Sequence, residues 1–371
     1  MSCKYRVVVS IDGGGKKGII PLRILSFLEE QLHAYIPDAH LSSWVDVYGG
    51  TSTSAIIAGA LAVSGVGGRK HSPTEITDLY LRRGEHFFDS PKSAHSVHPL
   101  NFLLEHFYGD LTLGQIRKHF LFVSYDLDKD EPFLFTDSQH HIQQISVAKM
   151  MQACCAMPGF LEAVMIGNKR LADGALTTKN PSKLAFQYAR VFYPDDPIVL
   201  ISIGTGKSQS ASFEEMQAEE QHDTLIELAK KDSKLVYFRF NPELENTDHS
   251  TEQLLGLTDV YIQENLRSIE RLLHLMEIKA GRLLWKFKDF VSAIMLFLWP
   301  MKLLIALTFL LILGACSSYN RVLKSDDYTE KFELANSLYD KGQFDRSVAL
   351  YEQVYPRMPK SAEGEVAYYR L

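Results

Sequence analysis

The chain has 371 residues, of which 46% are hydrophobic and 23% charged, a globular composition that excludes a disordered or collagen-like protein. Its net charge of -6 lacks the basic surplus typical of nucleic-acid-binding proteins, so we expect no nucleic-acid partner. Its four cysteines, Cys3, Cys154, Cys155 and Cys316, are too few and too unevenly spaced for a disulfide framework or a zinc site, so we expect no metal.

Strands and helices are predicted to alternate along residues 1–288. Short apolar runs rich in β-branched residues predict strands at 5–11, 45–48, 120–126, 132–136, 197–203 and 235–240. Apolar residues near helical spacing predict helices at 19–36, 55–62, 74–88, 146–156, 181–190, 213–231 and 258–283. This alternation favours an α/β fold around a mostly parallel sheet. No signal-peptide pattern precedes the first strand, so we expect this domain to lie in the cytoplasm.

The chain changes character after residue 288. Residues 289–316 form an apolar segment long enough to span a bilayer, although Pro300 and Lys302 interrupt it. From Met301, one cation, an apolar run and small residues before Cys316 are typical of a bacterial signal peptide whose cysteine becomes a lipid anchor. A plain transmembrane helix is the alternative, and a signal peptide behind so long a domain also suggests two joined reading frames.

The tail at residues 317–371 is predicted to be helical. Its small and aromatic residues are spaced as in one tetratricopeptide unit of two antiparallel helices, and the pattern stops before the roughly three repeats that a stable array needs. With the preceding segment, residues 301–371 resemble the N-terminus of the outer-membrane assembly lipoprotein of the Bam complex. We therefore expect a domain at 1–288, a hydrophobic membrane segment at 289–316 and a truncated helical tail.

A glycine cluster between the first strand and the first helix is the first candidate site motif. Residues 12–18 read DGGGKKG. Glycines let several N–H groups turn toward one point at a helix N-terminus, which favours a pyrophosphate or a transition-state oxyanion. The spacing also fits a dinucleotide-binding loop, but the acidic residues about 20 positions on fall inside a predicted helix.

Two further motifs supply a candidate nucleophile and a candidate base. Residues 50–54 read GTSTS and place Ser52 on a strand-to-helix turn, as in a G-x-S-x-G nucleophile elbow whose last glycine is replaced by Ser54. A helix N-cap is the structural alternative. Asp173, followed by Gly174, lies on a predicted turn, where an aspartate can accept the proton of a serine.

A Ser-His-Asp triad is the competing arrangement. The order Ser, Asp, His requires a histidine in a loop after Asp173. His222 and His249 follow Asp173 but lie among polar and acidic residues, and His274 falls inside a predicted helix. The sequence therefore favours a Ser-Asp dyad.

Taken together and in this order, the segments SIDGGGKKGII, YGGTSTSAII, LADGALTTKNP and VLISIGTG resemble the patatin-like phospholipases over about residues 5–288. The resemblance implies a three-layer α/β hydrolase that cleaves fatty-acyl esters through an acyl-enzyme. It implies a catalytic dyad of Ser52 and Asp173. The residues expected to form the oxyanion loop are Gly13, Gly14 and Gly15, and those expected to support the motifs are Asp12, Gly18, Gly50, Ser54 and Gly174.

The resemblance also implies partners. It implies a phospholipid or another acyl lipid as substrate, contact with a membrane surface and no cofactor. Some bacterial relatives respond to a nucleotide activator, but no nucleotide pocket is recognisable in this sequence. Because Ser54 departs from the family pattern, a catalytically weakened binding protein remains an alternative, as does a membrane-tethered scaffold.

Overall fold

The computed structural model describes residues 5–33, 40–64, 66–68, 71–88, 99–208, 212–245, 249–276, 319–358 and 360–371. The chain divides into two compact units, residues 1–283 and 284–371. The expected hydrophobic segment at 289–316, with the candidate anchor Cys316, lies outside the described residues. Among the helices that are described, none is both long enough and apolar enough to cross a membrane.

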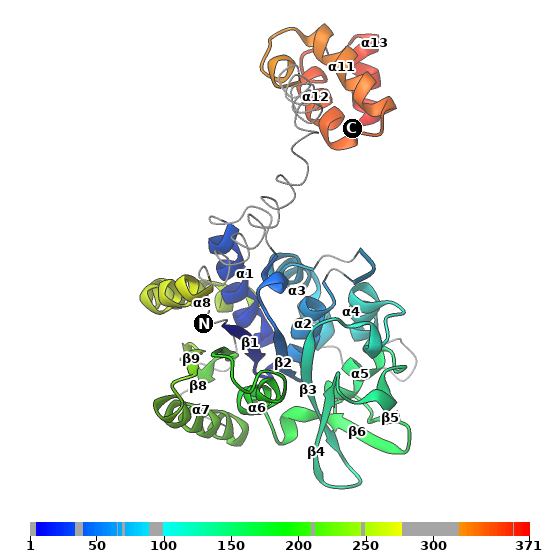
Figure 1. The fold of residues 1–371 in the computed structure, drawn as a ribbon. Coiled ribbons are helices and arrows are strands. Elements are labelled where there is room, and N and C mark those ends of the chain that lie inside the picture. Colours follow the sequence, from blue (N-terminus) through cyan, green and yellow to red (C-terminus); the bar gives the residue numbers. More distant parts are fainter. Residues whose placement is uncertain are drawn as a thin grey trace, which may run out of the picture. The chain divides into compact units, whose positions relative to one another are not determined.

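The first unit is built on an eight-stranded, mostly parallel sheet with the strand order β5-β6-β3-β2-β1-β7-β9, in which β4 also pairs with β3 (Figure 1). The strands β3, β2, β1, β7 and β9 run parallel, whereas β4, β5 and β6 are antiparallel to their neighbours. The strand bounds are β1 Arg6–Ile11, β2 Val47–Thr51, β3 His119–Asp126, β4 Glu131–Thr136, β5 Val164–Ile166, β6 Lys169–Asp173, β7 Ile198–Ile203 and β9 Leu235–Phe240. A separate pair joins β8 Lys207–Ser208 and β10 Glu243–Leu244.

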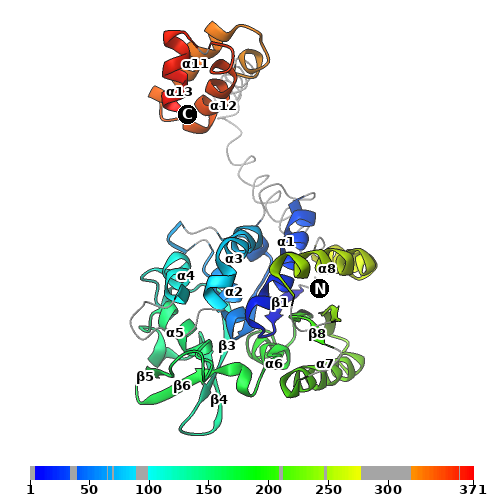
Figure 2. The same cartoon turned by 180° about the vertical axis from the view of Figure 1, so that it is seen from behind.

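Helices cover both faces of the sheet because its strands are apolar on both sides. Along β1, Val7 and Val9 belong to one core cluster and Val8 to another, as the period of two in a strand requires. The first cluster contains residues of α1, α2, α3, α4 and α5, and the second contains residues of α6 and α7. Figures 1 and 2 show these helices from opposite sides. The helix bounds are α1 Ile19–His33, α2 Thr53–Ala62, α3 Pro73–Phe88, α4 Pro99–Tyr108, α5 Val147–Cys154, α6 Ser182–Phe192, α7 Phe213–Lys231 and α8 Thr251–Glu264.

The edge of β3 is shared by two strands that approach from opposite directions. Along one edge of β3, β2 pairs with residues 119–123 and β6 pairs with residues 124–126. In this second pairing Ser124 lies opposite Asp173. The register of β4 overlaps both, so β4 must occupy the other edge. The ends of β2 and β6 therefore meet at Val123 and Ser124, which brings the residue after Thr51 close to Asp173.

The expected α/β architecture with a mostly parallel sheet is confirmed, with differences in detail. The elements β5, β6, β8, β10 and α4 were not predicted; the four strands are only two to five residues long, which leaves little local pattern. The helix predicted at 258–283 begins earlier, at Thr251, because Ser250 caps it by accepting a hydrogen bond from the Gln253 N–H. That helix ends at Glu264, and a second helical stretch follows at 266–276.

The second unit contains a small helical core. Its helices are α11 Tyr328–Asp340, α12 Phe344–Val354 and α13 Ala362–Arg370. Ala335, Leu350 and Ala367, one from each helix, are buried together. Tyr351 donates a hydrogen bond of 2.7 Å to Asn336 and thereby ties α12 to α11. The tetratricopeptide-like nature of this tail stays a prediction.

Candidate active site

Ser52 occupies a strained turn between β2 and α2. Its backbone has φ 56° and ψ -138°, and only one other described non-glycine residue, Asp130, has positive φ. Such a conformation costs about 1–3 kcal/mol and persists only where its surroundings enforce it. Gly50 makes the turn feasible, because a Cβ there would lie 2.8 Å from the Cα of Ala55. The sharp strand-to-helix geometry is that of a nucleophile elbow.

Ser54 fits the elbow in place of the usual glycine. The residue lies inside α2, where the backbone is helical and no positive φ is needed. Its side chain is fully buried, and its Oγ has no hydrogen-bond partner among the described residues. The departure from the motif therefore leaves the turn at Ser52 intact.

The structure brings Ser52 and Asp173 into direct contact. The Ser52 Oγ donates a hydrogen bond of 2.6 Å to Oδ2 of Asp173, and the Ala175 N–H donates to Oδ1 at 2.8 Å. Asp173 is 1% exposed, and burial raises its pKa to about 6 although these two hydrogen bonds oppose the shift. A carboxyl group with this pKa is mostly ionised at neutral pH and can accept a proton in contact with the serine.

Gly174 holds the aspartate turn against the sheet. A Cβ at this position would lie 2.4 Å from the carbonyl oxygen of Val123 in β3. The Asp173 N–H donates to the carbonyl of Ala156, which follows α5. The Asp-Gly pair is therefore required for close packing as well as for the turn.

The glycine loop lies against the elbow and differs from the expected oxyanion hole in one respect. The Gly13 N–H donates a hydrogen bond of 2.9 Å to the carbonyl of Lys179, so this amide is engaged within the chain, which an oxyanion donor would not be. Within the described part of the chain, no acceptor takes the N–H of Gly14 or Gly15. Gly15 has φ +56°, a conformation that favours glycine. The Thr53 hydroxyl donates to the Gly15 carbonyl at 3.3 Å, which ties the loop to the start of α2.

Two side chains from distant parts of the chain fix this loop. Arg239 of β9 donates two hydrogen bonds to Asp12, from Nη1 at 2.9 Å and from Nη2 at 2.6 Å, and both side chains are almost fully buried. Thr205 donates to the Gly13 carbonyl at 2.9 Å. Thr205 also lies so close to Gly14 that a Cβ there would be 2.3 Å from its Oγ1. Bidentate pairing and close packing together hold the loop in one conformation.

These positioning residues were missed at the level of the sequence. Thr205 lies in the quoted segment VLISIGTG, but without an assigned role. Arg239 interrupts the apolar run LVYFRF, and a charged side chain in a buried strand needs a partner. Gly18 closes the motif, where a Cβ would be 3.1 Å from Ile57 of α2.

The histidines do not form a triad with Ser52. The serine is bonded directly to Asp173, so no histidine lies between the two side chains. His222 is paired with the Tyr237 hydroxyl at 2.9 Å, and His119 with Asp137 at 2.7 Å. In the residues that the structure describes, no group of three or more His, Cys, Asp or Glu side chains could hold a metal ion.

Comparison with known proteins confirms the family resemblance for part of the chain. Residues 9–186 match the family model for the patatin-like phospholipases. Patatin-16 of Solanum tuberosum is 31% identical over 231 residues, which are 54% of this chain and 60% of that protein. Probable inactive patatin-3-Kuras 1 of the same plant is 29% identical over 232 residues, which are 54% of this chain and 62% of that protein. The chain thus spans less than two thirds of the length of these relatives.

Two solved structures are more distant. VipD from Legionella pneumophila has 13% identity and a TM-score of 0.34, with 99% of this chain and 86% of VipD covered. The ExoU-SpcU complex from Pseudomonas aeruginosa has 13% identity and a TM-score of 0.32, with 98% and 71% covered. Residues 9–186 are a patatin-like phospholipase domain on the strength of the family match. That match gives no support to the lipoprotein resemblance of residues 301–371.

Proposed function

We propose that this chain is a lipid acyl hydrolase of the phospholipase A type, with Ser52 as the nucleophile and Asp173 as the general base. The observation that supports the proposal most strongly is the hydrogen bond of 2.6 Å from the Ser52 hydroxyl, on its strained turn, to the buried carboxylate of Asp173. A serine hydroxyl is a weak nucleophile until a base accepts its proton, and this contact provides such a base.

The reaction would proceed in two halves. The Ser52 Oγ attacks the acyl carbonyl carbon while its proton passes to Oδ2 of Asp173. The tetrahedral intermediate collapses, the bond to the lipid alcohol breaks, and Asp173 returns the proton to that alcohol. Water then gives a proton to Asp173 and attacks the acyl-enzyme, and the fatty acid leaves as the Ser52 hydroxyl is restored.

The oxyanion of each tetrahedral intermediate would be held by the Gly14 and Gly15 amides. These N–H groups lie on the loop against the elbow and are not engaged by described residues, whereas Gly13 is. One such donor contributes about 3 kcal/mol to lowering the barrier. Gly13 therefore belongs to the support of the loop in this mechanism.

The substrate would be a phospholipid or another acyl lipid presented at a membrane surface, and the domain would act in the cytoplasm. Membrane attachment through residues 289–316, with Cys316 as an anchor if the tail is processed separately, is part of this proposal and concerns residues outside those described. The domain would end near residue 288.

The test is ester hydrolysis by the full chain, with p-nitrophenyl butyrate and with phosphatidylcholine vesicles. We expect Ser52→Ala and Asp173→Asn each to lower turnover by at least about 10³-fold. Ser26→Ala and Asp137→Asn are matched controls and should keep the activity. Ser26 is hydrogen-bonded to Thr77 and Asp137 to His119, so neither residue contacts Ser52 or Asp173. Near-normal turnover by Asp173→Asn would remove Asp173 as the base. An inert native chain would instead favour the binding-protein alternative.

A further inference from the structure

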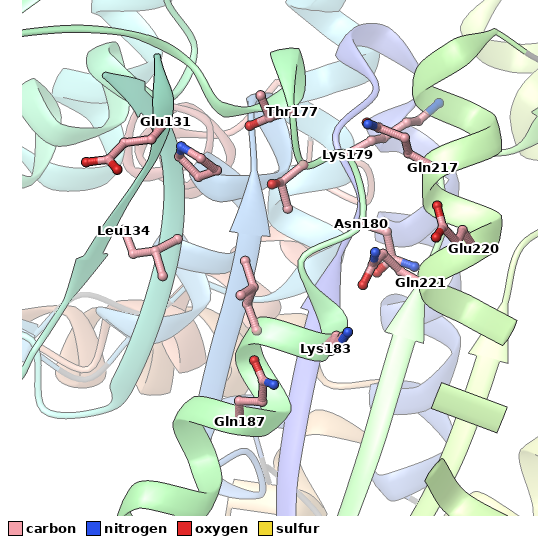
Figure 3. Close-up of a pocket in the computed structure, with 13 residues that line it drawn as sticks. Glu131, Leu134, Thr177, Lys179, Asn180, Lys183, Gln187, Gln217, Glu220 and Gln221 are labelled. Atoms are coloured by element: carbon pink, nitrogen blue, oxygen red, sulfur yellow. The ribbon is translucent and has the colours of Figure 1, made fainter. Parts of the chain in front are cut away.

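A buried carboxylate of α7 lies between two lysines beside the glycine loop. The Oε1 of Glu215 is 3.8 Å from the Nζ of Lys17 and 3.5 Å from the Nζ of Lys179. The Glu215 side chain is 9% exposed, and those of Lys17 and Lys179 are 19% and 12% exposed. Figure 3 shows Lys179 on the segment 177–180, beside the helix α7. The three side chains form a Lys-Glu-Lys trio with one anion for two cations.

The two lysines of the trio are bonded to the glycine loop through their backbones. The Lys17 N–H donates to the Gly14 carbonyl at 3.0 Å, and the carbonyl of Lys179 accepts the Gly13 N–H at 2.9 Å. Glu215 attracts the side chains of both lysines, so it draws together the two segments that bear on this loop.

The negative charge of Glu215 is not required for the structure of α7. The Oε2 of Glu215 accepts hydrogen bonds from the Ser208 hydroxyl at 2.6 Å and from the Ser212 N–H at 3.3 Å. The second bond belongs to the capping box that begins α7. Glutamine serves in a capping box as glutamate does, so the helix needs a side-chain oxygen at this position and no charge.

The electrostatics of the trio indicate what the charge does. Burial alone would raise the pKa of Glu215, but the Ser208 hydroxyl and the ammonium groups of Lys179 and Lys17 outweigh it and lower that pKa. Burial lowers the pKa of Lys17, and Glu215 opposes this shift. Without the anion, two largely buried cations would repel each other and push the two segments apart. Further charged groups that act on the two lysines are Lys16, Asp12 and Glu214.

We propose that Glu215 is a positioning residue for the oxyanion donors of the glycine loop. Its negative charge holds Lys17 and Lys179 together, so that the loop keeps the geometry that an oxyanion requires. The inference rests on the proposed function, since it concerns the reaction at Ser52. Glu215 lies beyond residues 9–186, so the family match assigns it no role.

The test is hydrolysis of p-nitrophenyl butyrate by the full chain with Glu215→Gln, which removes the charge and keeps the capping box. At pH 7.5 this variant should lower kcat about tenfold and leave KM within about twofold of native, because the displaced loop affects only the transition state. Arg239 and Thr205 still hold other points of the loop, so the loss should not be complete. Glu227→Gln, at an exposed position of the same helix, is the matched control and should change neither constant.

The pH profile of Glu215→Gln distinguishes a charge effect from a loss of packing. Lys17, whose pKa burial already lowers, should lose its proton more easily without Glu215, and the repulsion between the lysines then ends. The ratio of variant to native kcat should therefore rise at least about threefold between pH 7.5 and pH 9.5.

A second substitution tests the same point at one pH. Lys179→Met, added to Glu215→Gln, leaves one cation in the trio and keeps the backbone carbonyl that accepts from Gly13. The double variant should recover about half of the native kcat at pH 7.5. A thermal unfolding curve shows whether each variant is folded. If Glu215→Gln alone does not fold, the double variant carries the test, and it should fold with this same activity.

The outcomes separate this inference from the proposed function. A native chain that does not turn over p-nitrophenyl butyrate would refute the hydrolase itself. With an active native chain, an unchanged kcat in Glu215→Gln at pH 7.5 would overturn the positioning role alone. A loss of kcat that alkaline pH or Lys179→Met fails to relieve would overturn it as well.

Discussion

Replacing Asp173 by asparagine should stop hydrolysis and at the same time stabilise the fold at neutral pH. The carboxyl group is 1% exposed, and burial raises its pKa from 3.8 to about 6. Each pKa unit corresponds to about 1.4 kcal/mol, so the native protein carries a destabilisation of about 3 kcal/mol when Asp173 is ionised. Asparagine has a similar size and no charge; its oxygen can accept the Ala175 N–H while its amide group donates to the Ser52 Oγ.

The effect should depend on pH in a defined direction. The unfolded chain loses the Asp173 proton near pH 3.8, whereas the folded chain keeps it until about pH 6. The folded state therefore binds more protons in this window, and its stability falls as the pH rises through it. Relative to the native chain, Asp173→Asn should gain about 1–3 kcal/mol at pH 7.5 and lose most of that gain at pH 4.

Guanidinium unfolding of the full chain at pH 4 and pH 7.5 measures the difference in unfolding free energy between variant and native protein. The comparison requires that both have the same m-value, the slope of that free energy against denaturant concentration. Asp137→Asn is a control of opposite sign. Burial alone would raise the pKa of Asp137, but hydrogen bonds from His119, Phe120 and Tyr188 outweigh it and keep that pKa low. Asp137→Asn should thus lose stability at pH 7.5. A stability gain for Asp173→Asn that is no larger at pH 7.5 than at pH 4 would refute the reasoning.

Three further predictions concern the reaction itself. With p-nitrophenyl butyrate, kcat/KM should rise with pH and level off above a midpoint near pH 6, because Asp173 must be ionised to act as the base; a flat profile between pH 5 and 8 would contradict this. Gly14→Ala should lower kcat about 100-fold or more, because the new Cβ displaces the loop from Thr205. Steady-state kinetics measures the loss of activity, and a thermal unfolding curve shows whether the variant is still folded. Arg239→Gln should lower kcat more than it raises KM, since it removes the cation that fixes the loop, and a change confined to KM would argue against that role.

The predictable parts of the structure are those that a local pattern determines. The run Val7-Val8-Val9 before the glycines predicts a strand buried on both faces, and β1 is such a strand. The order of motifs also led to Ser52 and Asp173, which the fold places in contact. Elements with strong local signals therefore come from sequence alone.

The remaining parts depend on contacts between distant positions. The strand β6 has only five residues, and its pairing with β3 makes it a strand, so no local pattern could reveal it. The Gly13 N–H donates to the carbonyl of Lys179, far along the chain, and no sequence pattern near Gly13 predicts this bond. Arg239 was visible as a charge in an apolar strand, but its partner Asp12 lies 227 positions away.

The shared edge of β3 has a consequence for how the proposed activity would be lost on warming. The nucleophile is held by β2 inside the parallel sheet. Asp173 ends β6, whose pairing with β3 is limited to Ser124, Tyr125 and Asp126 and is supplemented by the Asp173 N–H bond to the Ala156 carbonyl. Short antiparallel hairpins open at lower free energy than whole domains unfold. Peeling of β5 and β6 would withdraw the carboxylate while the rest of the sheet persists. Ester hydrolysis should then be lost several degrees below the midpoint of the domain's cooperative unfolding. The loss should be reversible on cooling, because β6 can pair again with the intact strand β3.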